Sequence, residues 1–324
     1  MPTVYPGSRS YFGIGKETTP GTAVVAAQFP PWTKMDPADA PKILEDTGMR
    51  GSMGSQFGST LGPTLSGGDF DGPVMDDSLG QLLYNILGDY AVTGAGPYVH
   101  TFGLLNSGSA QPVTHTIVDA SGMTPTVGAR VYAYSCLSEL TLTGNAENLF
   151  VHSGKFTSNL SAPAASAPTN TPTTEQVVPS WRSVVTIGGT PATNVAEWEI
   201  TIKRQLAVKY TGNGTNAPYI IGRGDVSVDG KLTFVAADES PLTALNSNTQ
   251  QALVFAVDNG LATTNQRTIT ATLSKAYYKT AKPKRDTLIG WDVEFTGLLN
   301  ATDAAASGGL APCKVTVKNA VTTY

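Results

Sequence analysis

Strict alternation of apolar and polar residues is the feature that most limits how this chain can fold. Trp198, Ile200 and Ile202 alternate with charged residues and threonine. The same two-residue period recurs in three further segments, at residues 137–143, 268–274 and 291–296. Successive side chains of a β-strand point to opposite faces of its sheet. These segments therefore predict antiparallel strands with one buried and one solvated face.

Two segments predict short helices. Five apolar residues fall at helical spacing on one face of residues 77–87, namely Leu79, Leu82, Leu83, Ile86 and Leu87. Asp76, Asp77 and Ser78 are expected to cap this helix, and Gly88 to end it. The pair Ser240-Pro241 predicts the start of a second, shorter helix.

One turn signal stands out between two apolar runs. Asp229-Gly230 lies in the centre of residues 226–234. An Asp-Gly pair between alternating apolar residues is a strong short-range signal for a β-hairpin. The sequence therefore predicts a hairpin with its turn at Asp229-Gly230.

The order of these elements is repeated along the chain. SGGDF at residues 66–70 precedes the longer helix, and DGKLTF at residues 229–234 precedes the shorter one, with strands after each. We predict a first β unit with an N-terminal arm over residues 1–158 and a second β unit over residues 181–324. Residues 159–180, rich in Ser, Ala, Pro and Thr, are predicted to link them.

Charge is scarce for a chain of this length. Charged residues make up 14% of the 324 residues, against roughly 25% in ordinary soluble domains. Such a surface suits a protein that is covered by neighbouring subunits. The net charge of −4 disfavours a broad basic surface for nucleic acid. The sequence shows neither a signal peptide nor an apolar run of about 20 residues, so folding in a cytoplasm without membrane insertion is expected.

Residues that carry catalytic or metal chemistry are sparse. Cys136 and Cys313 are too few for a structural zinc site, and buried free thiols are favoured over one disulfide between them. His100, His115 and His152 lack metal-ligand spacing and are interpreted as structural. We predict no catalytic residue, metal or cofactor.

One segment superficially resembles a phosphate-binding loop. The pair Gly15-Lys16 is followed by Glu17, where a P-loop needs Ser or Thr. Ser10 occupies the position at which that motif needs glycine. A carboxylate beside phosphate is repulsive, so nucleotide binding is rejected.

Two kinds of charged cluster remain. Glu197/Glu199 and Asp292/Glu294 are interpreted as a solvated acidic surface rather than a glycosidase pair, which needs one carboxyl with a raised pKa. A basic cluster interleaved with Tyr277 and Tyr278 consists of Lys275, Lys279, Lys282, Lys284 and Arg285. It is predicted to be an exposed loop that contacts an acidic patch on a neighbouring subunit, with nucleic-acid binding as the alternative.

Several segments resemble tail tube proteins of long-tailed bacteriophages. The N-terminal one is GIGKETTPGTAV at residues 13–24. Others are FPPWTK at 29–34, LSELT at 137–141, KLTFVAADE at 231–239 and KVTVKNA at 314–320. The resemblance is scattered over most of the chain, and the order of the segments makes it specific.

The resemblance implies a mainly β fold with a few short helices, in which two sandwich or half-barrel units join their sheets to those of neighbouring subunits. It implies a structural virion protein, assembled in the host cytoplasm, whose rings stack into a tail tube that conducts DNA. Tape measure, tail tip and terminator proteins are the expected further partners. Polar strand faces are the candidate lumen surface, with Glu139, Thr141, Glu197, Glu199, Asp292 and Glu294 as its residues. The Gly/Pro-rich residues before 68 are candidate arms between rings.

The repeat also bears on stoichiometry. Two tube-like units per chain favour a trimeric ring with pseudo-sixfold symmetry, with a homohexamer as the alternative. Two other functions stay open. One is a virion surface protein that binds carbohydrate or a receptor, through exposed aromatic clusters such as Tyr277/Tyr278 or Tyr5/Tyr11/Phe12. The other is a β-rich glycosidase.

Overall fold

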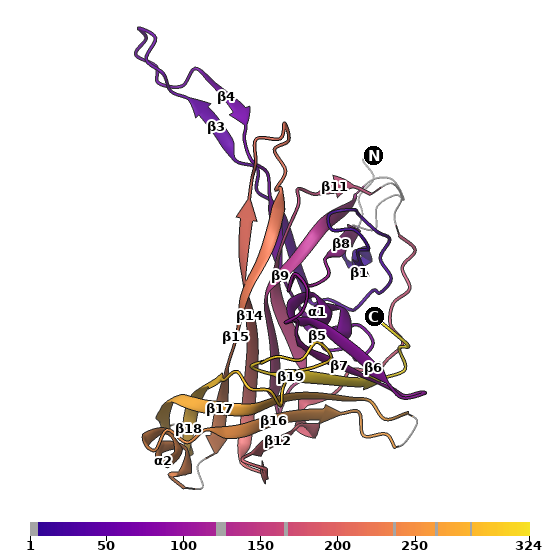
Figure 1. The fold of residues 1–324 in the computed structure, drawn as a ribbon, viewed down its shortest axis with the longest axis vertical. Helices are drawn as coiled ribbons and strands as arrows, with labels where there is room; N and C mark the ends of the chain where they lie inside the picture. Colours follow the sequence, from indigo (N-terminus) through magenta and orange to yellow (C-terminus); the bar gives the residue numbers. More distant parts are fainter. Residues whose placement is uncertain (1–5, 121–127, 165–167, 236–237, 263–264, 286) are drawn as a thin grey trace.

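The computed structural model describes residues 6–120, 128–164, 168–235, 238–262, 265–285 and 287–324 (Figure 1). The first half contains, in order, η1 (Gly7–Arg9), β1 (Tyr11–Lys16), β2 (Lys34–Asp39), β3 (Ile43–Asp46), β4 (Gly58–Leu61), β5 (Ser66–Pro73), α1 (Leu79–Leu87), β6 (Gly88–Thr93), β7 (Tyr98–Leu104), β8 (His115–Ala120), β9 (Ala129–Asn145), β10 (Val151–Ser158) and β11 (Ala162–Pro163). The second half contains η2 (Ser180–Arg182), β12 (Val184–Ile187), β13 (Thr190–Ala192), β14 (Val195–Lys209), β15 (Ile220–Val235), α2 (Ser240–Asn246), β16 (Gln251–Asp258), β17 (Thr268–Arg285), β18 (Ile289–Gly297) and β19 (Lys314–Asn319). The predicted mainly β class is confirmed.

Eight strands of the described chain form one antiparallel sheet that crosses from the first half to the second. Their order is β2, β5, β10, β9, β14, β15, β18 and β17. The pairing of β9 with β14 joins the halves, from Glu139 opposite Lys203 to Asn145 opposite Glu197. Figure 1 shows β14 and β15 along the long axis, with β17 and β18 crossing the lower end.

The two halves repeat the same pairings. The order β2–β5–β10–β9 is matched by β14–β15–β18–β17, and a helix follows the second strand in each half. The long strands β9 and β17 both extend beyond this sheet. The early part of β9 pairs with β8, which pairs with β1, just as β17 pairs with β16 and β16 with β12. SGGDF at residues 66–70 and DGKLTF at residues 229–234 suggested a repeated order of elements, and the strand pairing repeats in the same order.

The helix α1 lies at the centre of the hydrophobic core. Leu79, Leu83, Ile86 and Leu87 are at most 2% exposed. Gly88 ends the helix at φ +90°, a conformation that glycine adopts without steric cost. The capping prediction is wrong in one respect, because the Ser78 side chain makes no capping hydrogen bond.

The shorter helix α2 begins at Ser240 with Pro241 in its first turn, as predicted. Its only buried residue is Pro241, and Leu242 and Leu245 are half-buried against the core. This helix therefore contributes much less to the core than α1.

The prediction of a hairpin turn at Asp229-Gly230 is wrong, because β15 continues through this pair. A Cβ on Gly230 would lie 2.2 Å from the Phe295 ring and 2.3 Å from the Glu199 carbonyl oxygen. Glycine is needed here for close packing between strands rather than for a turn.

The prediction of an exposed loop at residues 275–285 is also wrong. These residues belong to β17 and pair with β18, from Ala276 opposite Gly297 to Arg285 opposite Ile289. Pro283 is compatible with this strand because the far side of this part of β17 has no partner strand among the described residues.

A separate two-stranded arm of β3 and β4 extends from the upper end of the molecule (Figure 1). Ile43, Leu44 and Leu61 are exposed on it, and Met49 and Met53 lie fully exposed between its strands. At its base, the Thr64 N–H donates to the carbonyl of Asn216, 2.9 Å away, in the connection between β14 and β15.

The segment between the halves runs against the first half. The Ser161 hydroxyl donates to the Asp39 carboxylate at 2.7 Å. Isolated β-bridges join Pro172 to Phe29 and Pro179 to Leu149.

Candidate functional site

One face of the eight-stranded sheet is polar, and its side chains form rows across the strands. One row runs from Thr141 through Thr201 and Asp229 to Thr296. The opposite face carries the buried apolar residues that the two-residue period predicted, including Leu140, Leu142, Ile200, Ile202, Val293 and Phe295. The sheet therefore presents one continuous polar surface.

All six residues that we predicted to face a lumen lie on this polar face: Glu139, Thr141, Glu197, Glu199, Asp292 and Glu294. Lysines alternate with them. Lys203 lies opposite Glu139, Lys231 lies between Glu199 and Glu294, and Lys282 lies opposite Asp292. The acidic surface expected from the sequence is therefore a surface of mixed charge.

Hydrogen bonds link the polar face across strands. The hydroxyls of Thr141 and Thr201 lie 3.0 Å apart. The Asp229 carboxylate accepts hydrogen bonds from Thr296 and from the Lys279 ammonium, each at 2.7 Å. Partial burial opposes ionisation of Asp229, but these two donors hold its pKa below the usual value. Most partners of this face come from neighbouring strands, so the surface is ordered by the sheet itself.

The eight-stranded sheet ends in two open edges of opposite charge. No strand of the described chain covers the outer side of β2, where Asp36 and Asp39 are exposed. At the other end, no strand among the described residues pairs with the far side of residues 277–285 of β17, and Lys282, Lys284 and Arg285 are exposed there. An open strand edge presents backbone groups that can pair with another strand. Four of the five residues of the basic cluster predicted to make subunit contacts, all but Lys275, thus lie on a sheet edge.

The segment that resembles a phosphate loop has a structural role. Glu17 is 4% exposed. Its carboxylate accepts hydrogen bonds from the backbone N–H groups of Gly21 and Tyr134 and from the hydroxyls of Thr114 and Thr116, at 2.6–2.9 Å. Four donors satisfy the buried charge and fix the N-terminal segment to the strands behind it.

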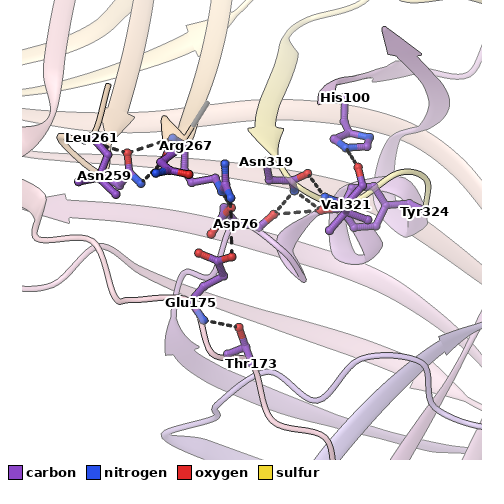
Figure 2. A network of polar contacts seen from close by, with 11 residues as sticks. Asp76, His100, Thr173, Glu175, Asn259, Leu261, Arg267, Asn319, Val321 and Tyr324 are labelled. Atoms are coloured by element: carbon purple, nitrogen blue, oxygen red, sulfur yellow. Dashed lines mark hydrogen bonds and ion pairs between the residues drawn. The ribbon is translucent and has the colours of Figure 1, made fainter. Parts of the chain in front are cut away.

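A buried polar network joins three distant parts of the chain (Figure 2). Asp76, just before α1, forms an ion pair with Arg267 at 3.4 Å, and Arg267 also approaches Glu175 at 4.0 Å. Burial, followed by the charge of Glu175, raises the pKa of Asp76 to about 7 against the opposing effect of Arg267. The network links the start of α1, the segment between the halves and the start of β17.

The C-terminal tail joins the same network. The Tyr324 hydroxyl donates to the Asp76 carbonyl at 2.9 Å, and the Tyr324 side chain is 3% exposed. The carbonyl of Val321 accepts a hydrogen bond from His100 at 2.8 Å (Figure 2). The end of the chain is thereby fixed to the first half.

The histidines and cysteines lie inside the fold. His115 contacts Asn85 and Gln81 at 2.8 Å each, and burial lowers its pKa to about 3. His152 packs against the Trp32 ring, and burial lowers its pKa to about 4. Cys136 and Cys313 are buried free thiols, as predicted, so the alternative disulfide is not formed.

Within the described ranges, no group of three or more His, Cys, Asp and Glu residues could hold a metal ion. No helix in that part of the chain has the length and apolar character needed to cross a membrane.

The aromatic clusters that would favour glycan binding are not exposed as a group. Tyr278 is 6% exposed, and Tyr11 and Phe12 are half-buried in β1. Tyr5 lies outside the described residues. The structure therefore adds no support for a carbohydrate site there.

A family model for phage tail tube protein matches residues 7–309. The resemblance seen in the short sequence segments is thereby confirmed. No curated protein matches the chain.

Proposed function

We propose that this chain, which belongs to the phage tail tube protein family and is a structural component of the virion tail, assembles with copies of itself into stacked rings that conduct DNA. The observation that carries the proposal is an eight-stranded sheet with one polar face and two open edges. Pairing such edges between subunits closes the sheet into a barrel and removes the edges.

The strand count favours three chains in each ring. Neighbouring strands lie about 4.8 Å apart, and barrel strands tilt by about 40° from the axis. With eight strands per chain, three chains give a barrel about 50 Å across, and six give about 100 Å. After side chains fill part of the interior, the smaller barrel suits a single DNA duplex. We therefore propose a trimer with pseudo-sixfold symmetry, with the homohexamer as the alternative.

The repeated pairings support two tube-like units in each chain. We propose that residues 1–158 and 181–324 form these units, with residues 159–180 between them. The short strand β11, in the segment between the units, pairs with β9 as β19 pairs with β17, so the equivalent part of the long strand has a partner strand in both halves.

The polar face is the proposed lumen surface. Its carboxylates repel phosphate, and the lysines among them are flanked by carboxylates on neighbouring strands. Tight binding to DNA depends on the release of counterions by unopposed cationic groups. The mixed surface therefore supports transient passage of DNA without specific binding.

The arm of β3 and β4 is the proposed contact between stacked rings. It projects from one end of the molecule and exposes Ile43, Leu44 and Leu61 away from the body (Figure 1). Exposed apolar surface of this kind is typical of interaction sites. At the two ends of the tube, the same surfaces would contact other tail proteins, such as the tape measure, tail tip and terminator.

Electron microscopy of the concentrated, purified protein tests the proposal. We expect rings or tubes, with threefold symmetry in a reconstruction. True sixfold rings of whole chains would contradict the trimer but not the assembly. A protein that stays monomeric at high concentration and binds glycan would contradict the proposed function.

A further inference from the structure

The internal repeat allows the two long strands to be aligned residue by residue. The β9–β10 ladder has an irregularity at Ser138, between Leu137 and Glu139. The β17–β18 ladder has one at Lys279, between Tyr278 and Thr280. Phe156 and Phe295 lie opposite the residue before each irregularity, Leu137 and Tyr278 respectively. Counting onward from the irregularity, Thr143 in β9 corresponds to Lys284 in β17.

The strands β2 and β14, which begin the matching four-strand orders of the two halves, can be aligned in the same way. Phe156 lies opposite Gly68, and Phe295 lies opposite Gly230. Gly68 in turn lies opposite Pro37 in β2, and Gly230 lies opposite Ile200 in β14. A Cβ on either glycine would meet the carbonyl oxygen of the preceding residue on that strand, Asp36 or Glu199, at 2.6 and 2.3 Å. Asp36 therefore corresponds to Glu199.

The junction inside the chain then predicts the junction between chains. Within the chain, β9 pairs with β14, with Glu199 opposite Thr143. We infer that β17 of one copy pairs with β2 of a second copy in the equivalent antiparallel register, with Asp36 opposite Lys284 and Pro37 opposite Pro283. This inference rests on the proposed ring assembly and specifies its contact.

The charges on the two edges support this register, and they are independent of the strand irregularities and the glycines. Asp36 lies on the polar face, in an exposed ion pair with Lys34 of the same strand at 2.9 Å, and Asp69 and Asp71 lie opposite this pair on β5. Lys282 and Lys284 lie on the polar face of β17, with Lys282 opposite Asp292 of β18 and Lys284 opposite Gly290. The inferred register places an acidic strand edge against a basic one, and opposite charges on facing strands are favourable.

The two prolines explain how the free edges remain soluble. Proline cannot donate a backbone hydrogen bond, and it is one of the residues that protect exposed sheet edges from indiscriminate pairing. Pro37 and Pro283 lie on the two open edges at the same level of the inferred junction. Specific pairing then depends on the charged residues on either side of them.

Cysteine cross-linking of assembled full-length protein tests the register. We expect Asp36→Cys with Lys284→Cys to give disulfide-linked chains in rings under mild oxidation. The matched pair Asp36→Cys with Thr280→Cys, four residues out of register on the same face, should give little product. The native thiols stay in both variants, because they are buried.

Charge exchange provides a second readout if the cysteines disturb assembly. Asp36→Lys and Lys284→Asp should each slow ring formation severalfold, and the double variant should recover the wild-type rate. Rings that cross-link only out of register, or that show no recovery in the double variant, overturn the inference while leaving the ring proposal intact. Failure of the wild-type protein to form any ring would overturn both.

Discussion

The two halves share a strand order but differ in how their helices are covered. Helix α1 contacts β9, β7, β6, β1 and β14, and all but one of its residues are buried. Helix α2 contacts chiefly β17 and buries only Pro241. The Tyr324 ring packs directly on α1, where a Cβ on Gly80 would lie 2.3 Å from it. The same pattern of strands thus carries a deep core in one half and a shallow one in the other.

The sheet is therefore alike in the two halves, whereas the hydrophobic core beneath it is not. The paired strands that form the polar face are present in both halves. The added coverage, from β6, β7 and the C-terminal tail, lies on the first half, where it encloses α1. We expect the first half to hold most of the stability of the chain, with the second half depending on its ties to the first.

Truncation of equivalent helices should give the largest contrast. Leu83→Ala removes a fully buried side chain and should lower the free energy of unfolding by about 3–5 kcal/mol. Leu242→Ala, in the half-buried helix, should lower it by about 1 kcal/mol. Urea denaturation of the two variants measures both values. Equal losses would show that α2 is buried in solution and would end the contrast.

Removing the cation between the halves should have the next largest effect. Arg267→Met leaves Asp76 and Glu175 facing each other without their shared partner. We expect a loss of about 3 kcal/mol at pH 8, because a buried charge is left uncompensated. The double variant Arg267→Met/Asp76→Asn should recover much of this loss. No recovery would mean that Arg267 stabilises the protein through other contacts.

Alanine at the two equivalent glycines should give a smaller difference. At Gly230, a Cβ would meet Phe295 and the Glu199 backbone within a strand that has neighbours on both sides. At Gly68, it would meet Asp36 and Pro37 of an edge strand, which can shift outward. We expect Gly230→Ala to cost about 2 kcal/mol more than Gly68→Ala, since overpacking costs most where relaxation is blocked. Thermal unfolding of the pair would reveal the reverse order if β2 is the more rigid strand.

The pH dependence of stability should report on the ionisation of Asp76, whose network links the first half to the second. The pKa of Asp76 is raised from 3.8 to about 7, so between these values the folded protein binds a proton that the unfolded chain has released. This group therefore makes stability fall as the pH rises from about 4 to 7, by at most ~1.4 kcal/mol per pH unit. Asp76→Asn should make stability rise more steeply with pH across this range in urea titrations, because the lowered pKa values of His115 and His152 act in the opposite direction. An unchanged slope would show that Asp76 ionises normally in the folded protein.

Period-two segments and helical spacing were enough to predict the β class, α1, α2 and the buried apolar face. These patterns gave wrong predictions where the same residue types occur in two kinds of structure. The Asp229-Gly230 pair is typical of a turn, yet Gly230 makes room for Phe295, which is distant in the sequence. Lysines and Pro283 are typical of an exposed loop, but an open sheet edge tolerates the same residues, so the loop prediction was wrong.

The polar face could be predicted only in part. The six predicted residues were found because their own strands alternate. Lys231 and Lys282 were not joined to them, because that requires the register between strands. Register depends on contacts between distant segments, which a single sequence does not specify. The network of Asp76, Glu175 and Arg267 was missed for the same reason.

The long ladder between β14 and β15 has a mechanical consequence. The two strands run side by side along the long axis of the molecule, from Val195 opposite Phe234 to Lys209 opposite Ile220 (Figure 1). Tension along that axis loads their hydrogen bonds in shear, so that many must break together rather than one after another. The fold is therefore stiff against stretching in the direction in which β14 and β15 run.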